Sequence, residues 1–123
     1  KYGVPMVDKI FEIIDYFDPQ YYIMENPKTG NMKHYINDLI PYYDIDYCKY
    51  SNWGYKKTTR FWTNIEGLTF NKCIKDCENM IEVKGKKHKK DVSITVGGGT
   101  NRLERYRIPS KVIEMFFNII DVN

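Results

Sequence analysis

Glu25 is the residue in this sequence best placed to belong to a functional site. It follows a continuous apolar run, Tyr21 to Met24, of the kind that fills a strand buried on both faces of a sheet. Open α/β sheets bind their ligands at the carboxyl ends of such strands, so a carboxylate there is a candidate site residue. An acidic residue at an ordinary strand end, held by a loop amide, explains the same pattern. Both interpretations stay open on these residues alone.

Cysteine and histidine residues form a second candidate site. Cys73 and Cys77 are separated by three residues and His88 follows eleven residues later, so these three could supply zinc ligands. Cys48 or His34 could then be the fourth ligand. Two ordinary thiols and a solvated histidine in a lysine-rich loop are the alternative. Because three cysteines are an odd set and no secretion signal is visible, we expect reduced thiols or a metal site rather than a disulfide framework.

Basic residues are concentrated in the last third of the chain. The densest run holds Lys84, Lys86, Lys87, Lys89 and Lys90, and Arg102, Arg105 and Arg107 follow it. Such cations could contact DNA phosphates, because phosphate contacts release counterions and need no base specificity. A solvated charged face is the alternative, since a chain rich in lysine and without alanine is typical of an AT-rich coding sequence. The triplet Gly97 to Gly99 lacks the flanks of a nucleotide-binding loop and predicts a hinge or turn.

The composition of the chain limits the classes of protein it can belong to. Its 123 residues are 42% hydrophobic and 28% charged, with a net charge of +3, which predicts one globular domain. The longest apolar runs are far shorter than the roughly 18 residues that cross a bilayer, so we expect no membrane partner. Without a signal peptide, an intracellular protein of the cytoplasm or nucleus is expected.

Apolar spacing predicts helices at both ends of the chain. One covers Val7–Phe17, and the other follows Ser110, which could cap its start. Between them, after the strand predicted from Tyr21 to Met24, three further short elements are expected: a helix over Tyr35–Leu39 and strands over Tyr43–Tyr50 and Thr59–Asn64. The two strands, with no long helix between them, predict a local antiparallel pair. The first helix and the buried run after it predict half of a parallel α/β unit.

Four motifs, taken in order, resemble those of cytosine-C5 DNA methyltransferases. Glu25-Asn26-Pro27 resembles the family's Glu-Asn-Val motif, and closely resembles the Glu-Asn-Pro form of divergent phage and large-virus members. Asp46 to Tyr50 is similar to that group's tyrosine-cysteine strand, and Gly54 to Asn64 to its Lys-Pro-Thr and Trp-Thr-Asn signature. Arg105 to Pro109 is similar to its Arg-Ile-Pro ending. Thr58 departs from the pattern, because the divergent group often has proline there.

The resemblance implies an α/β fold, in which this chain is the carboxyl-terminal part of a Rossmann-like methyltransferase sheet with an irregular insert and a final helix. Residues 1–65 and 101–123 would form the partial core, and 66–100 an insert for target recognition or zinc binding. The family's glycine-rich S-adenosylmethionine loop and Pro-Cys nucleophile loop should precede Glu25, and neither appears there. We therefore expect the chain alone to be inactive, with a second chain or a missing segment carrying the cofactor half.

The implied reaction transfers a methyl group from S-adenosylmethionine to C5 of a cytosine flipped out of duplex DNA, after a thiolate attacks C6. Glu25 would hold the N3 and N4 edge of the base, and Asn26 would fix the loop. Thr59 and Arg60 would face the base pocket, with Arg60 contacting the cytosine O2 or orienting Glu25. An edge-strand arginine that reaches water is the alternative for Arg60.

The insert and the cysteines complete these expectations. Lys86, Lys87, Lys89 and Lys90 would lie in the target-recognition segment and contact DNA. Cys48 is not expected to be the nucleophile, because it is predicted in a strand beside tyrosines that keep its thiol neutral. Two other functions remain open: a non-catalytic DNA-binding or partner subunit that keeps the methyltransferase scaffold, and an unrelated zinc-stabilised binding module. A viral or phage origin fits the form of the first motif.

Overall fold

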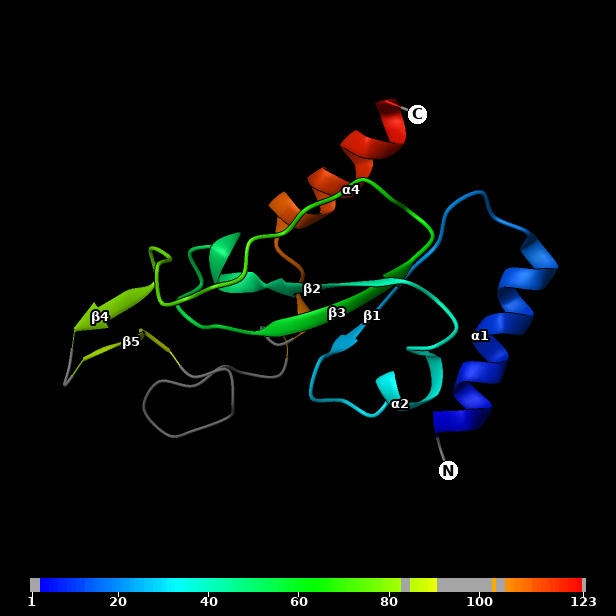
Figure 1. The fold of residues 1–123 in the computed structure, drawn as a ribbon, viewed down its shortest axis with the longest axis horizontal. Helices are drawn as coiled ribbons and strands as arrows, with labels where there is room; N and C mark the ends of the chain where they lie inside the picture. The colour runs from blue at the N-terminus through cyan, green and yellow to red at the C-terminus, as the bar shows by residue number, and fades with distance from the viewer. Residues whose placement is uncertain (1–2, 83–84, 91–102, 104–105, 123) are drawn as a thin grey trace. The chain divides into compact units, whose positions relative to one another are not determined.

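The computed structural model describes residues 3–82, 85–90, 103 and 106–122, shown in colour in Figure 1. The chain forms two compact units. The first unit comprises Lys1–Asp44 and Thr59–Gly67, and the second comprises Ile45–Thr58 and Leu68–Asn123. Four features singled out in the sequence lie outside the described residues: Lys84, the Gly97–Gly99 triplet, Arg102 and Arg105.

Two helices of the first unit pack on a small apolar core. Helix α1, Gly3–Phe17, confirms the predicted amphipathic helix and begins four residues earlier than expected. Helix α2, Lys33–Ile36, is the short helix predicted before Pro41, shifted towards the amino terminus. The buried members of the core are Val7, Ile36, Ile40 and Trp62, with Phe11, Tyr22, Met24, Met32 and Tyr35 packed against them. Helices α1 and α2 therefore cover the side of the sheet to which Met24 and Trp62 point.

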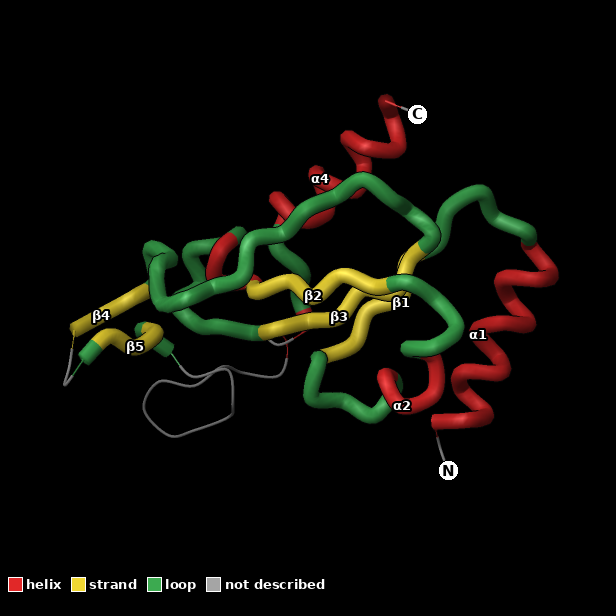
Figure 2. Tube along the Cα trace, in the orientation of Figure 1, coloured by secondary structure: helices red, strands yellow, loops and turns green. Residues whose placement is uncertain are grey.

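The main sheet has three strands in the order β1-β3-β2, drawn in yellow in Figure 2. Strand β1 is Ile23–Pro27, β2 is Tyr42–Asp46 and β3 is Thr58–Thr63. Strands β1 and β3 are antiparallel, in a register that pairs Ile23 with Thr63 and Pro27 with Thr59. The strand predicted near Thr59–Asn64 is thus confirmed. It is the central strand of the sheet, and five of its six side chains are buried.

The apolar run before Glu25 does not form the strand that was predicted from it. A strand buried on both faces was expected over Tyr21–Met24, whereas β1 begins at Ile23 and has a described neighbour only along β3. Ile23 is 42% exposed, and exposed and half-buried residues alternate along β1. The prediction of two-sided burial is wrong for the described chain, because Tyr22 precedes the strand and packs into the helical core instead. The described strand pairing around β1 is antiparallel, and a Rossmann-like sheet stays a prediction.

The second unit contains short elements that the sequence analysis did not predict in full. The strand expected over Tyr43–Tyr50 ends at Asp46, and the chain turns into a 3-10 helix, η1, Tyr47–Lys49. Its closing hydrogen bond runs from the Tyr50 N–H to the Tyr47 carbonyl, 3.0 Å. Strands β4, Met80–Glu82, and β5, Lys86–His88, form an antiparallel hairpin. This hairpin lies in the segment that was expected to be irregular.

Helix α4, Ser110–Val122, confirms the helix predicted at the end of the sequence. Ser110 is its first residue, and the N–H groups of Val112 and Ile113 bond to the Pro109 carbonyl at 3.0 and 3.3 Å. Val112 and Phe116 are buried, and the Phe116 ring lies 5.9 Å from that of Phe70. No described helix combines the length and apolar character needed to cross a membrane. The mixture of helices and antiparallel strands is compatible with a fragment of an α/β fold.

Candidate functional site

The pairing of β1 with β3 divides the candidate residues of the first unit between two faces of the sheet. Glu25 is paired with Phe61, and Asn26 is paired with Arg60. Paired residues of an antiparallel sheet point to the same side, and successive residues point to opposite sides. Glu25 therefore projects on the face of Phe61, where it is exposed to solvent. Asn26 and Arg60 project from the other face.

Asn26 lies against the turn that follows β1. The Gly30 N–H donates to the Pro27 carbonyl at 2.8 Å, which closes a turn over Pro27–Gly30. The Asn26 carboxamide oxygen occupies the position that a Cβ atom on Gly30 would take. The absence of a side chain on Gly30 therefore lets Asn26 lie this close to the turn. This contact is what the predicted loop-fixing role of Asn26 requires, and that role stays a prediction.

Arg60 is held by an ion pair within the first unit. Its Nε and Nη2 atoms donate to Asp44 Oδ1 and Oδ2 at 2.7 and 2.8 Å, and its guanidinium stacks on the Tyr42 ring at 3.9 Å. Burial acts to raise the pKa of the Asp44 carboxyl, but the hydrogen bonds and charge of Arg60 outweigh it and hold that pKa below its ordinary value. Lys28 adds a weaker ion pair to Asp44, 3.7 Å.

These contacts change the roles that Arg60 can take. At 6% exposure on the central strand, it is not an edge-strand arginine that reaches water. It also lies on the opposite face from Glu25, so it does not orient that carboxylate directly. Thr59 shares the face of Glu25 and is fully buried. The Thr59 hydroxyl oxygen has no hydrogen-bond partner among the described residues.

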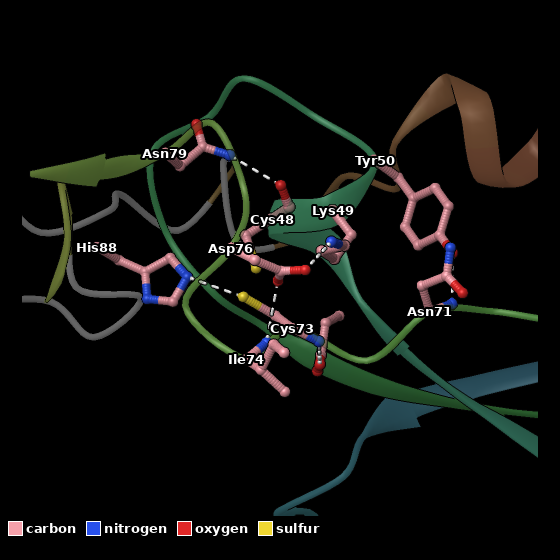
Figure 3. A network of polar contacts seen from close by, with 10 residues as sticks. Cys48, Lys49, Tyr50, Asn71, Cys73, Ile74, Asp76, Asn79 and His88 are labelled. Atoms are coloured by element: carbon pink, nitrogen blue, oxygen red, sulfur yellow. Dashed lines mark hydrogen bonds and ion pairs between the residues drawn. The ribbon is translucent and has the colours of Figure 1, made fainter. Parts of the chain in front are cut away.

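Four ligand-type side chains meet in the second unit, and Figure 3 shows three of them, Cys48, Cys73 and His88. Cys48 comes from η1, Cys73 and Cys77 from the turn before β4, and His88 from the end of β5. Their sulfur and nitrogen atoms all lie within 4.8 Å of one another, and Cys73 Sγ lies 3.6 Å from His88 Nε2. The structure thus brings together the three residues predicted as zinc ligands. Of the two candidates for a fourth, the described cluster contains Cys48 and not His34.

Two polar side chains hold the segments of this cluster in place. Neither was predicted from the sequence to have this role. The Asp46 carboxylate accepts from the Cys73 N–H at 2.7 Å and from the Thr58 hydroxyl. The Asn79 amide nitrogen donates to the carbonyls of Cys48 and Ser51 at 2.9 and 2.8 Å. Asp46 and Asn79 are both buried, and a buried polar group is stable only when its hydrogen bonds are made. No spacing rule marks such residues, because their partners lie far away in the sequence.

The cluster alters the acidity of its members. Burial, together with the neighbouring Cys73 and Cys77, raises the pKa of the Cys48 thiol well above its ordinary value. A raised pKa agrees with the neutral thiol expected for Cys48 in the absence of a metal, although the residue lies in a 3-10 helix and not in a strand. Burial also acts to raise the pKa of Cys73, but hydrogen bonds from Cys48 and from the N–H groups of Lys75 and Asp76 lower it overall. Burial and the charge of Lys56 lower the pKa of His88.

The predicted DNA-contacting lysines lie on and beside strand β5. Lys86, Lys87, Lys89 and Lys90 are all exposed. The backbone that carries them is fixed, since the Lys89 N–H donates to the Asn79 carbonyl at 2.9 Å and the Lys90 N–H to the Gly54 carbonyl at 2.6 Å. Arg107, the described arginine of the same basic set, stacks on the Trp53 ring at 3.8 Å. The hairpin therefore presents four cations from a defined backbone.

Comparison with known proteins finds a viral relative. The chain is 42% identical over 118 residues to a probable DNA (cytosine-5)-methyltransferase of Frog virus 3 (isolate Goorha). The match covers 90% of this chain and 55% of the viral protein, so the chain spans about half the length of that relative. No family model matches the chain, and no solved structure does. The chain is therefore similar to part of that viral protein.

Proposed function

We propose that this chain is part of a DNA cytosine-C5 methyltransferase, in which Glu25 contacts the flipped cytosine. The observation that carries the proposal is the identity to the viral relative, together with the position of the Glu25-Asn26-Pro27 motif. Glu25 projects from β1 into solvent, and β1 is followed by a turn that Asn26 lies against. An exposed carboxylate beside a fixed turn is free to accept a ligand, whereas a carboxylate already in an ion pair is not.

The proposed role of Glu25 is to form hydrogen bonds with the N3 and N4 edge of the cytosine. Attack of a thiolate at C6 of cytosine moves electron density towards N3, and a proton or hydrogen bond supplied at N3 favours that movement. The same carboxyl group can accept a hydrogen bond from the N4 amino group, which selects cytosine. General acid help of this kind contributes about 10²- to 10⁴-fold to a rate.

We assign different supporting roles to Thr59 and Arg60. Thr59 shares a face with Glu25, and its hydroxyl oxygen lacks a partner in the described structure, which makes it a candidate for a contact on that side. Because Thr59 is fully buried, such a contact would require the residues that cover it to move. Arg60 forms an ion pair with Asp44 and stacks on the Tyr42 ring, so we assign it the role of positioning strand β3. A direct contact of Arg60 with the cytosine O2 would require this ion pair to open.

Duplex DNA and S-adenosylmethionine complete the proposal. Exposed Lys86, Lys87, Lys89 and Lys90 form a basic hairpin suited to phosphate contacts. S-adenosylmethionine supplies the methyl group when bound. Among the described residues, no glycine-rich turn joins a strand to a helix, so we assign cofactor binding to a second chain or to a further segment of the natural protein. This chain alone would then be inactive.

The test compares methyl transfer to cytosine-containing duplex DNA by the longest natural protein that contains this chain and by its Glu25→Gln variant. We expect the variant to lose at least about 100-fold in rate while its circular dichroism spectrum stays unchanged. Glu66→Gln is the matched control, because Glu66 is also an exposed glutamate of the first unit and lies outside the motif. Near-normal methylation by Glu25→Gln would refute the assignment. Salt-sensitive DNA binding without any methyl transfer would favour a non-catalytic partner subunit.

A further inference from the structure

We propose that Cys48, Cys73, Cys77 and His88 bind one structural zinc ion in the second unit. This inference does not depend on the methyltransferase proposal. Three thiol sulfurs and one imidazole nitrogen are among the donor sets that close the coordination sphere of structural zinc. The sequence spacing supplied three of these ligands, and the fold supplies the fourth from a segment 25 residues earlier than Cys73.

The distances in the cluster fit a tetrahedral ion. With Zn–S bonds of about 2.3 Å and a Zn–N bond of about 2.05 Å, tetrahedral angles separate sulfur from nitrogen by about 3.6 Å and sulfur from sulfur by about 3.8 Å. Cys73 Sγ and His88 Nε2 are 3.6 Å apart, and all four ligand atoms lie within 4.8 Å of one another. Small movements of side chains would complete the geometry. The three cysteines are free, so no disulfide competes for their sulfurs.

The surroundings of the cluster resemble those of a closed, structural site. Cys48 and Cys73 are 1% and 6% exposed, and Cys77 and His88 are half-buried. The N–H groups of Lys75 and Asp76 donate to the Cys73 sulfur, and Lys75 takes a left-handed backbone conformation at φ 65° in that turn. Backbone donors aimed at a sulfur orient a metal ligand, as the second shell of a metal site requires.

The position of the four ligands shows what the metal would do. Helix η1, the turn over Cys73–Cys77 and strand β5 are separate along the chain, and each is too short to be stable alone. One ion bonded to all three would fix them to one another, which is how metals stabilise small domains with little apolar core. His88 ends the strand that presents Lys86 and Lys87, so the ion would also anchor the basic hairpin.

Elemental analysis of the natural protein, purified under reducing conditions without chelators, tests the proposal. We expect His88→Ala and Cys73→Ser to contain about one zinc per chain less than the parent protein. His34→Ala is the matched control, because His34 is the other histidine of the chain and lies outside the cluster. A difference below about 0.2 zinc per chain between the parent and His88→Ala would overturn the proposal.

A second measurement covers the case in which these variants fail to fold. After removal of the metal, cobalt(II) added to the parent protein should give the visible absorption bands of a tetrahedral ion with thiolate ligands. His34→Ala should give the same bands, and His88→Cys should retain metal binding with shifted bands, since four thiolates also form a closed site. A parent protein that folds but gives no such bands would refute the site.

Discussion

Arg60 and Asp44 join neighbouring strands of the main sheet through two parallel hydrogen bonds, Nε to Oδ1 at 2.7 Å and Nη2 to Oδ2 at 2.8 Å. The planar guanidinium matches the two carboxylate oxygens, and this geometry gives both strength and direction. Arg60 is nearly buried, whereas 30% of the Asp44 side chain is exposed. The solvent exposure of the Arg60–Asp44 pair is therefore intermediate between that of a surface ion pair and that of a fully buried one.

Asp44→Asn should destabilise the fold by about 2 kcal/mol. The substitution removes the charge that compensates Arg60, and the expected cost lies between the small effect of exposed pairs and the 3–5 kcal/mol of buried ones. Urea unfolding followed by circular dichroism measures the difference. Asp38→Asn, an exposed aspartate of the same unit, should change the midpoint little. Equal effects of the two substitutions would contradict the importance of the pair.

The stability contributed by Asp44 should depend on pH in the acid range. Its pKa in the folded protein is below the ordinary value of 3.8, despite the opposing effect of burial, because Arg60 and Lys28 favour the charged form. A lowered pKa gives stability that is present above the unfolded value and is lost as the pH falls through the folded value. The difference in unfolding free energy between the parent and Asp44→Asn should therefore shrink below about pH 4. A difference that stays constant down to about pH 2 would argue against this origin.

Asn79→Ala should destabilise the second unit by about 2–3 kcal/mol. The Asn79 side chain makes hydrogen bonds with the Cys48 and Ser51 carbonyls and with the Gly54 N–H, and its removal leaves buried groups without partners. Thermal unfolding gives the magnitude. Asn52→Ala is the control, because Asn52 is exposed and lies in the same loop region. If both variants melt at the parent temperature, this network does not hold the unit together.

Gly30→Ala should affect activity more than stability. The new Cβ would meet the Asn26 carboxamide oxygen, the far end of a side chain that can rotate away, so we expect a stability cost of no more than about 1 kcal/mol. The displaced Asn26 would no longer lie against the turn after β1. If Asn26 fixes that turn, methyl transfer by the full-length protein should fall at least about tenfold. Thr29→Ala, in the same exposed turn, should leave the rate unchanged.

The lysines of the basic hairpin should determine how salt affects DNA binding. The logarithm of the affinity falls linearly with the logarithm of the salt concentration, and each lysine that contacts a phosphate makes this slope steeper by about 0.9. Lys86→Gln with Lys87→Gln should therefore reduce that slope by up to about 1.8. Lys72→Gln with Lys111→Gln removes the same charge from other exposed positions of the second unit and should change it less. Identical slopes for the two double variants would favour a merely solvated face.

The sequence predicted the elements whose signal is local. Helices α1 and α4 have continuous apolar periodicity, and strand β3 has large residues bounded by polar ones, so each was found within a few residues of its bounds. The burial of β1 was predicted wrongly, because an apolar run does not say whether both faces of a strand will be covered. The end of β2 at Asp46 was missed as well, since that carboxylate is held by contacts with Cys73 and Thr58.

The candidate metal site was predictable only in part. Cys73, Cys77 and His88 follow one another at a spacing that zinc ligands use, whereas Cys48 and His34 were equal candidates for the fourth position. The choice between them depends on how η1 packs against the Cys73–Cys77 turn, which Asn79 and Asp46 secure through contacts across 27 to 31 residues. The ion pair of Arg60 was missed for a similar reason, because its partner Asp44 precedes it by 16 residues.

The pairing of Met80 with His88 in the β4–β5 hairpin has a consequence for how the lysines are displayed. Side chains alternate along a strand, so the direction in which His88 points also decides the direction of Lys87, its neighbour on β5. A slip of one residue would turn every side chain of β5 to the opposite face. With His88 directed at Cys73, Lys87 faces away from the sulfurs. The contact of His88 with Cys73 thus fixes the register of β5. Only the arrangement in which Lys87 faces away from the sulfurs is compatible with it.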